Sequence, residues 1–143
     1  MIVTLSKREL SIAAQVGCAR YSAAMFAGRQ DAHGLSKADG WGLHIEGAAV
    51  EMAAAKALEH YWVPSVDTFK TGSDIGTSIQ VRTRSRHSYD LIVRPDDRDE
   101  DHLVLVTGIA PRFHVRATIL GARCQASRIL GRDEAPGLCR HRC

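Results

Sequence analysis

The chain lacks a long hydrophobic run. Hydrophobic residues make up 45% of its 143 residues and charged residues 24%, which is ordinary for a soluble globular protein of one domain. No apolar stretch approaches the roughly 20 residues of a membrane helix. The segment MIVTLSKREL at residues 1–10 meets charge too early for the apolar stretch of a secretory signal. We therefore expect a cytoplasmic protein without a membrane partner.

Cysteine is scarce and unevenly placed. Cys18 stands alone, whereas Cys124, Cys139 and Cys143 fall late in the chain. This distribution argues against a secreted disulfide scaffold. The ending CRHRC offers Cys139, His141 and Cys143 as zinc ligands with Cys124 as a fourth, but the usual paired ligand spacing is missing. We expect reduced thiols with no structural role.

Several catalytic motifs are absent as well. The histidines form no H-x-x-x-H pair, and the chain contains neither a serine nucleophile elbow nor a glycine-rich phosphate loop. The acidic segment DDRDEDH at residues 96–102 lacks the glycine and the distal glutamate of an EF-hand loop. Metalloprotease, serine hydrolase and nucleotide-binding functions gain no support, and the acidic segment is predicted to be a solvated turn.

Positive charge is concentrated at one end of the sequence. Residues 1–121 carry 14 basic and 14 acidic side chains, and residues 122–143 carry 5 and 2. Residues 1–121 are predicted to form a single α+β domain, and residues 122–143 a loose basic tail without hydrophobic periodicity. Binding of nucleic acid by the domain would then require a local patch, for which Arg82, Arg84 and Arg86 are the candidates.

Two helices are predicted in the first half of the chain. Ser6 and Glu9 have the spacing of a capping box, so a helix is expected to begin there and to continue to Gly28 with a face of mostly small residues. A second, alanine-rich helix is expected over residues 44–62, ended by Pro64. Both helices precede the segments that resemble strands.

The second half of the chain alternates with a period of two residues. Ile79, Val81 and Thr83 are predicted to face one side of a strand, and Gln80, Arg82 and Arg84 the other. The segments YDLIVRP and HLVLVTG suggest an antiparallel hairpin, and RFHVRATILG a further strand. The order of elements predicts an α+β fold with a mixed or mainly antiparallel sheet of about four strands.

One set of residues combines oxygen ligands with a cation. Glu51 shares a helical stripe with apolar residues, so it is predicted to be partly buried or to lie at the edge of the core. Asp74 precedes the strand, and Gln80 and Arg82 project from the same side of it. Magnesium-assisted cleavage of a phosphodiester needs hard oxygen ligands and a cation for the phosphate, which these residues would supply.

Glu51, followed by Asp74 and then by Gln80, Val81 and Arg82, resembles the signature of the PD-(D/E)XK nuclease superfamily, a helix glutamate, a strand aspartate and Glu/Gln-x-Lys. The resemblance implies a restriction-endonuclease-like fold with DNA as substrate. It also implies a magnesium ion bound by Glu51, Asp74 and the oxygens of Gln80 or Val81, with Arg82 on the scissile phosphate. Residues 9–121 also resemble a group of small uncharacterised proteins of bacterial and phage-like genomes.

The sequence departs from this signature at three positions. Ser73 replaces the proline, Gln80 the usual acid and Arg82 the lysine. Arginine stays protonated in proteins, so it can bind charge but cannot assist an attacking water molecule as a lysine can. Glutamine also removes one negative charge from the metal site.

Three other interpretations therefore stand beside the enzyme. In the first, Arg82, Arg84 and Arg86 bind nucleic-acid phosphates or an acidic protein without turnover. In the second, the chain is an interaction protein of a mobile element that forms a homodimer through its sheet edge or first helix. In the third, Asp74 is a turn residue and Glu51 forms a salt bridge to an arginine of the strand.

Overall fold

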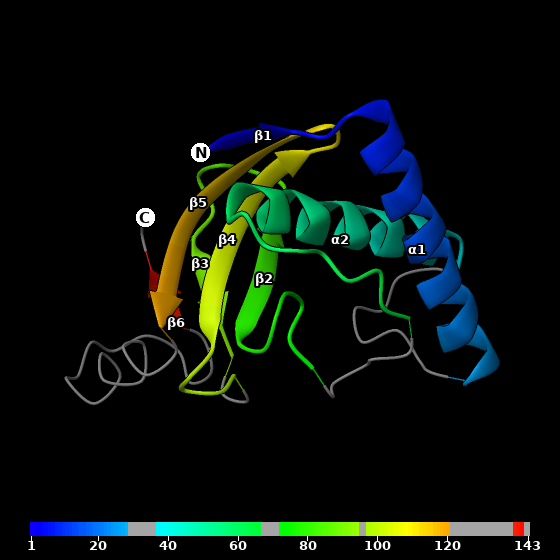
Figure 1. The fold of residues 1–143 in the computed structure, drawn as a ribbon. Helices are drawn as coiled ribbons and strands as arrows, with labels where there is room; N and C mark the ends of the chain where they lie inside the picture. The colour runs from blue at the N-terminus through cyan, green and yellow to red at the C-terminus, as the bar shows by residue number, and fades with distance from the viewer. Residues whose placement is uncertain (29–36, 67–71, 95–96, 121–138, 142–143) are drawn as a thin grey trace.

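The computed structural model describes residues 1–28, 37–66, 72–94, 97–120 and 139–141. The elements in chain order are β1 (Ile2–Thr4), α1 (Lys7–Phe26), α2 (Lys37–Ala57), β2 (Ile79–Arg84), β3 (Leu91–Val93), β4 (His102–Ile109), β5 (Arg112–Leu120) and β6 (Cys139–His141). A four-stranded sheet has the order β1-β5-β4-β2, and β3 pairs with β6 (Figure 1). The predicted α+β class with two helices and a mixed four-stranded sheet is confirmed.

Helix α1 begins at the predicted capping box. The Ser6 backbone N–H donates to a Glu9 carboxylate oxygen at 2.6 Å, and the Glu9 N–H donates to the Ser6 hydroxyl at 3.3 Å. Lys56, in the last turn of α2, donates to both Glu9 oxygens at 2.8 and 2.9 Å. The hydrogen bond from Lys56, and then those from Ser6, lower the pKa of Glu9 to about 2. Glu9 thus links the start of α1 to the end of α2.

Helix α2 differs from the prediction at both ends, because it spans Lys37–Ala57 rather than residues 44–62. It closes before Pro64 through a Schellman motif. The His60 N–H donates to the Ala55 carbonyl at 2.9 Å and the Glu59 N–H to the Lys56 carbonyl at 3.4 Å, while Glu59 takes the left-handed conformation with φ 56°. The motif lacks the usual glycine, so the sequence does not signal it.

Gly40 of α2 and Gly17 of α1 serve close packing. A Cβ at Gly40 would lie 2.3 Å from the Tyr21 ring, and one at Gly17 would lie 2.4 Å from the Ile45 Cα. These contacts explain why α2 includes a glycine-containing segment that propensity alone places outside a helix. The face of mostly small residues predicted on α1 thus meets α2 closely at Gly17.

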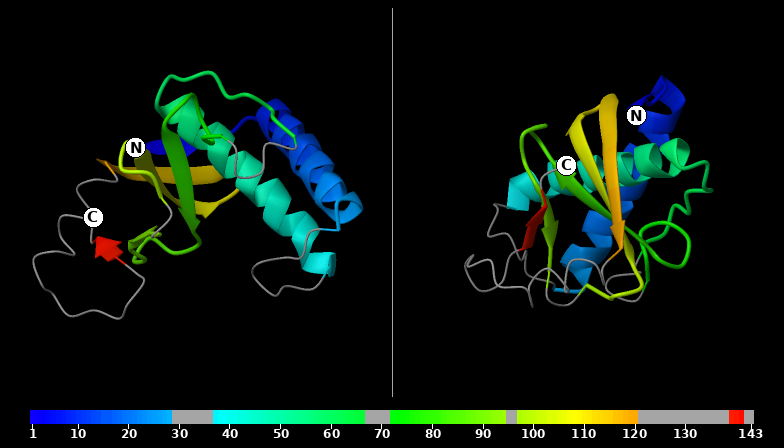
Figure 2. Two further views of the ribbon diagram at one scale, coloured as in Figure 1. Left: turned by 90° about the horizontal axis from the view of Figure 1, so that it is seen from below. Right: turned by 90° about the vertical axis from the view of Figure 1, so that its left-hand side faces the viewer.

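The main sheet is covered on both faces. On one face Val104 and Val106 of β4 join the core formed with the helices, and on the other Leu103 and Leu105 pack against β3. Figure 2 shows α1 and α2 on one side of the sheet and the β3–β6 pair on the other. Strand β4 is therefore buried on both faces, as a central strand is expected to be.

The predicted hairpin between the strands now labelled β3 and β4 is wrong. Strand β4 pairs in parallel with β2 and antiparallel with β5, so both of its edges are occupied. Strand β3 instead packs on the face of β4 and pairs with β6. Strand β1, which pairs with β5, was not predicted because three residues show no usable period.

The predicted tail lies mostly outside the described residues. Of residues 122–143, only Cys139–His141 are described, as strand β6. Cys124 and Cys143, two of the zinc ligands considered above, lie outside the described part. Among the described helices, none is long and apolar enough to cross a membrane.

Candidate functional site

Glu51 of α2 lies against α1, where Arg20 binds both of its carboxylate oxygens. The two Arg20–Glu51 distances are 2.7 and 2.8 Å, and the Trp62 indole N–H donates to the same carboxylate at 3.3 Å. Arg20 also donates through Nε to the Ser65 carbonyl at 2.8 Å. The side chains of Arg20 and Glu51 are 19% and 14% exposed. The predicted partial burial of Glu51 is confirmed, and its partner is Arg20 rather than an arginine of β2.

Asp74 lies just before β2 and holds the start of that strand. One of its oxygens accepts the Val81 backbone N–H at 2.7 Å. Between them the chain makes a tight turn, in which Ile75 and Ile79 exchange backbone hydrogen bonds of 3.1 and 3.3 Å. Asp74 therefore binds backbone as a turn aspartate does. Its carboxylate accepts a hydrogen bond from an N–H on the edge of β2 that does not pair with β4.

The charge of Asp74 is influenced by Glu51. Burial, and then the negative charge of Glu51, raise the pKa of Asp74 to about 6, against the opposing effects of the Val81 N–H, Arg82 and Arg20. Burial disfavours the ionised form, and a nearby like charge does so further. The structure thus brings Glu51 and Asp74 into one neighbourhood, together with Arg20, which the sequence analysis had not considered as a site residue.

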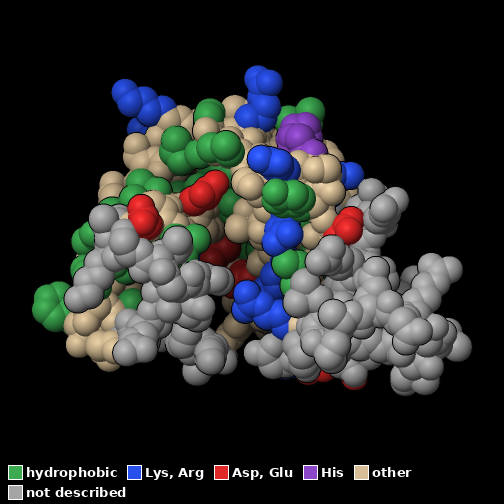
Figure 3. All heavy atoms as spheres, turned by 180° about the vertical axis from the view of Figure 1, so that it is seen from behind, with side chains coloured by type: hydrophobic (Ala, Val, Ile, Leu, Met, Phe, Trp, Pro, Cys, Tyr) green, Lys and Arg blue, Asp and Glu red, His purple; other side chains and the backbone are tan. Residues whose placement is uncertain are grey.

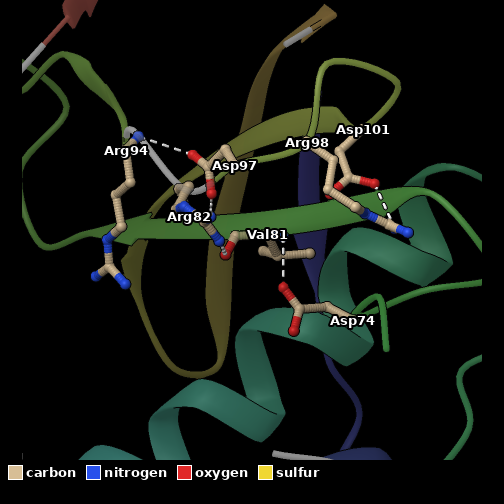
Figure 4. Close-up of polar contacts among 7 residues, drawn as sticks. All are labelled: Asp74, Val81, Arg82, Arg94, Asp97, Arg98 and Asp101. Atoms are coloured by element: carbon tan, nitrogen blue, oxygen red, sulfur yellow. Dashed lines mark hydrogen bonds and ion pairs between the residues drawn. The ribbon is translucent and has the colours of Figure 1, made fainter. Parts of the chain in front are cut away.

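Gln80 and Arg82 project from the other face of β2. Ile79 and Val81 pack against the core formed with the helices, so the residues that alternate with them face away from α2. Arg82 forms an ion pair with Asp97, whose second oxygen accepts the Arg94 N–H at 2.8 Å. Figure 4 shows Asp74 on the helix side of β2 and the Arg82–Asp97 pair on the opposite side. The strand itself separates Arg82 from the two carboxylates.

This arrangement does not fit a magnesium ion held by Glu51, Asp74 and Gln80. Both Glu51 oxygens accept hydrogen bonds from Arg20, and Gln80 lies across the strand from Asp74. A small octahedral cation needs several oxygens directed at one point. Within the described part of the chain, no group of three or more His, Cys, Asp or Glu side chains is arranged to hold a metal.

Arg84 and Arg86, at the end of β2 and just beyond it, have a different environment. The Arg84 guanidinium lies 4.8 Å from the centroid of the Tyr89 ring, and that of Arg86 lies 5.8 Å from it. Both distances are within the range of cation–π contacts. None of the ion pairs among the described residues involves either arginine. Both cations are thus held by an aromatic ring rather than by a carboxylate of the described residues.

The space-filling view shows how charge is distributed on one face of the molecule. In Figure 3, Lys and Arg side chains follow one another in a column interrupted by hydrophobic side chains, beside a recess with acidic side chains at its floor. Positive charge is therefore gathered locally, although residues 1–121 have equal numbers of acidic and basic side chains. A local patch of this kind is what binding of a polyanion requires.

Sequence analysis missed Arg20, His114 and Arg116, although each had a signal. Arg20 continues the helical stripe of Ala13 and Val16, so a charged group there was bound to meet the core and require a partner. His114 and Arg116 alternate with buried residues of β5 and so share one face of that strand.

Comparison of the chain with protein-family models, with curated proteins and with solved structures finds no match.

Proposed function

We propose that this chain is a non-catalytic nucleic-acid-binding module that contacts phosphates with Arg84 and Arg86. The observation that carries the proposal is the pair of guanidinium groups on Tyr89 that form no ion pair among the described residues. Arginine binds phosphate oxygens through a planar fork of donors. An aromatic ring beside such cations offers a surface on which a base can stack. That combination favours a nucleic acid over an acidic protein.

Arg82 has a lesser part in this proposal than the sequence suggested. Its guanidinium is already bound to Asp97 and to the Val81 carbonyl at 3.3 Å. A phosphate would have to compete with a carboxylate for it. We assign Arg82 to holding the segment after β3 against β2, and Arg84 and Arg86 to the ligand.

Hydrolysis of DNA is the second candidate function. The observation in its favour is that Glu51 lies close enough to Asp74 for its charge to add to burial, the larger cause, in raising the pKa of Asp74 to about 6. Such pairs of carboxyl groups occur in active sites and also in structural networks. Against it stand the occupied Glu51 oxygens and the position of Arg82 across the strand.

The binding proposal is tested with labelled single-stranded and double-stranded oligonucleotides in fluorescence anisotropy over a range of salt concentrations. The double substitution Arg84→Gln and Arg86→Gln is expected to weaken binding and to reduce the slope of log affinity against log salt by about one for each phosphate that is no longer bound. Arg8→Gln, on the exposed first turn of α1, is the matched control and is expected to leave the slope unchanged. Equal effects of the two variants would contradict the proposal, as would tighter binding of polyglutamate than of the oligonucleotide.

The catalytic alternative is tested in the same preparations. Supercoiled and single-stranded DNA are incubated with magnesium, with manganese and with a chelator. We expect no cleavage. Cleavage that Asp74→Asn abolishes, while the variant keeps the wild-type circular dichroism spectrum, would overturn the non-catalytic part of the proposal.

A further inference from the structure

Two histidines from distant parts of the sequence are in ring contact on the sheet face from which Arg84 projects. The ring centroids of His87 and His114 are 4.1 Å apart. His87 Nδ1 lies 2.6 Å from the hydroxyl of Thr107, a fully buried residue of β4. The Arg116 guanidinium donates to the backbone carbonyl of His87. The loop after β2 is thus fixed to β4 and β5 at this point.

The strand register places these residues in a row with Arg84. Arg84 pairs with Thr107, and Thr107 pairs with His114 on the next strand. With neighbouring strands about 4.8 Å apart, the Cα atoms of Arg84 and His114 are separated by roughly 10 Å. Because Phe113 and Val115 face the helix-side core, His114 lies on the opposite face of the sheet. The row runs across the strands on the side from which Arg84 also projects.

Among the described residues, the charged groups that act on His114 are cationic. Arg112 and Arg116 flank His114 on β5, and the N-terminal amine of Met1 is held by the Val115 carbonyl at 2.7 Å. Partial burial, then His87, and then the amine, Arg112 and Arg116 lower the pKa of His114. None of the ion pairs among the described residues involves His87 or His114. Two imidazoles beside cations in such a place disfavour a bound metal cation and favour an anion.

We infer that His87 and His114 form a second phosphate-binding element, which takes another phosphate of the nucleic-acid strand held by Arg84 and Arg86 and takes up a proton as it does so. With Nδ1 of His87 occupied by Thr107, its Nε2 is left as the donor to a ligand. A phosphate brings the negative charge that favours imidazolium. This inference rests on the proposed function for its ligand, but the phosphate-binding element is testable without a nucleic acid.

The first experiment uses inorganic phosphate as the probe. Histidine ring-proton signals of the wild-type chain are followed by NMR between pH 5 and 8.5, in phosphate and in chloride at equal ionic strength, with signals assigned from His87→Gln and His114→Gln. The pKa of His114 is expected to rise in phosphate, and the ring-proton signals of His87 are expected to shift with it. His102, at the other end of β4, is the internal control, and its signals are expected to be the same in the two buffers. An unchanged pKa of His114 together with unchanged His87 signals would overturn the inference.

The second experiment measures oligonucleotide affinity against pH. Wild-type affinity is expected to rise by about tenfold for each unit by which the pH falls, over the range in which one proton is taken up. His87→Gln and His114→Gln are expected to flatten this dependence, His102→Gln to leave it intact, and the Arg84 and Arg86 double variant to weaken binding at every pH without flattening it. Binding that is independent of pH in the wild type would sink the histidine element and spare the proposed function. If the wild type binds no oligonucleotide but phosphate still affects the histidines, the proposed function would be overturned and the histidine element would stand.

Discussion

Arg20 of α1 and Glu51 of α2 form a two-pronged ion pair with N–O distances of 2.7 and 2.8 Å, although they are 31 residues apart in the sequence. Through its Nε–H, Arg20 also donates to the Ser65 carbonyl. One arginine side chain therefore joins both helices to the segment that leads towards Asp74. The carboxylate that the sequence suggested as a metal ligand is thus the centre of a structural network.

Breaking this pair from one side is expected to be costly. Arg20→Met leaves the largely buried Glu51 carboxylate without its counter-charge, and we expect a loss of about 3 kcal/mol in the free energy of unfolding. Adding Glu51→Leu removes the orphaned charge and is expected to recover most of that loss. Urea unfolding of the two variants measures both effects.

The matched control is the exposed pair between Lys56 and Glu9, whose side chains are 45% and 31% exposed. Lys56→Met is expected to cost about 1 kcal/mol or less, because water screens exposed ion pairs. If Arg20→Met costs no more than Lys56→Met, the Arg20 network is not a determinant of stability.

Asp74 is expected to make the protein less stable as pH rises. Its folded pKa of about 6 lies above the ordinary value of 3.8, so between these values the folded state binds more protons than the unfolded state. The contribution of Asp74 to the free energy of unfolding is then most favourable below about pH 4. It falls as the pH rises from 4 to 6 and is least favourable above pH 6. The difference is up to about 3 kcal/mol, at 1.4 kcal/mol for each pKa unit.

Asp74→Asn isolates this effect, because the amide oxygen can still accept the Val81 N–H. The variant is expected to be more stable than the wild type at pH 7.5 and to lack the decline between pH 4 and 6. Unfolding curves at pH 4, 5, 6 and 7.5 compare the two proteins. A variant less stable than the wild type at pH 7.5 would mean that the Val81 N–H, Arg82 and Arg20 stabilise the ionised Asp74 by more than burial and Glu51 destabilise it.

Glu9 is expected to give the opposite pH dependence. Its folded pKa of about 2 lies below the ordinary value of 4.5, so its contribution is present above pH 4.5 and is lost as pH falls towards 2. Glu9→Gln is expected to cost about 1 kcal/mol at neutral pH, the usual size of a capping interaction. The gap between variant and wild type should narrow in unfolding curves taken at pH 3. A difference in the free energy of unfolding that stays the same at pH 3 and at neutral pH would indicate that Glu9 stabilises the protein through packing rather than through its charge.

Local signals predicted local structure well in this chain. The Ser6 and Glu9 capping box, the alternation along β2 and the partial burial of Glu51 all follow from residues a few positions apart. Contacts between residues far apart in the sequence could not be predicted, because the pattern within one helix or strand does not specify the element that packs against it. Arg20 for Glu51 and β6 for β3 are both such cases. The nuclease signature likewise specified residue types in order, whereas the placement of Gln80 and Arg82 depends on which face of β2 meets the helices.

The contact between Gly17 and α2 allows a sharp test of how the helices pack. A Cβ at position 17 would lie 2.4 Å from the Ile45 Cα and 2.7 Å from the His44 carbonyl oxygen, which are backbone atoms that cannot rotate away. Gly17→Ala must therefore push the helices apart, and we expect a loss of about 2–3 kcal/mol in the free energy of unfolding, as for other overpacked sites.

Gly47 of α2 is the control, since a Cβ there would meet no atom within 4 Å. Gly47→Ala is expected to gain up to about 1 kcal/mol from helix propensity. Thermal and urea unfolding of both variants measure the change in the free energy of unfolding. Helix propensity alone favours alanine at both positions, so only the contact at Gly17 can make the substitution destabilising there. A stabilised Gly17→Ala variant would show that α1 and α2 do not approach as closely as their backbones indicate.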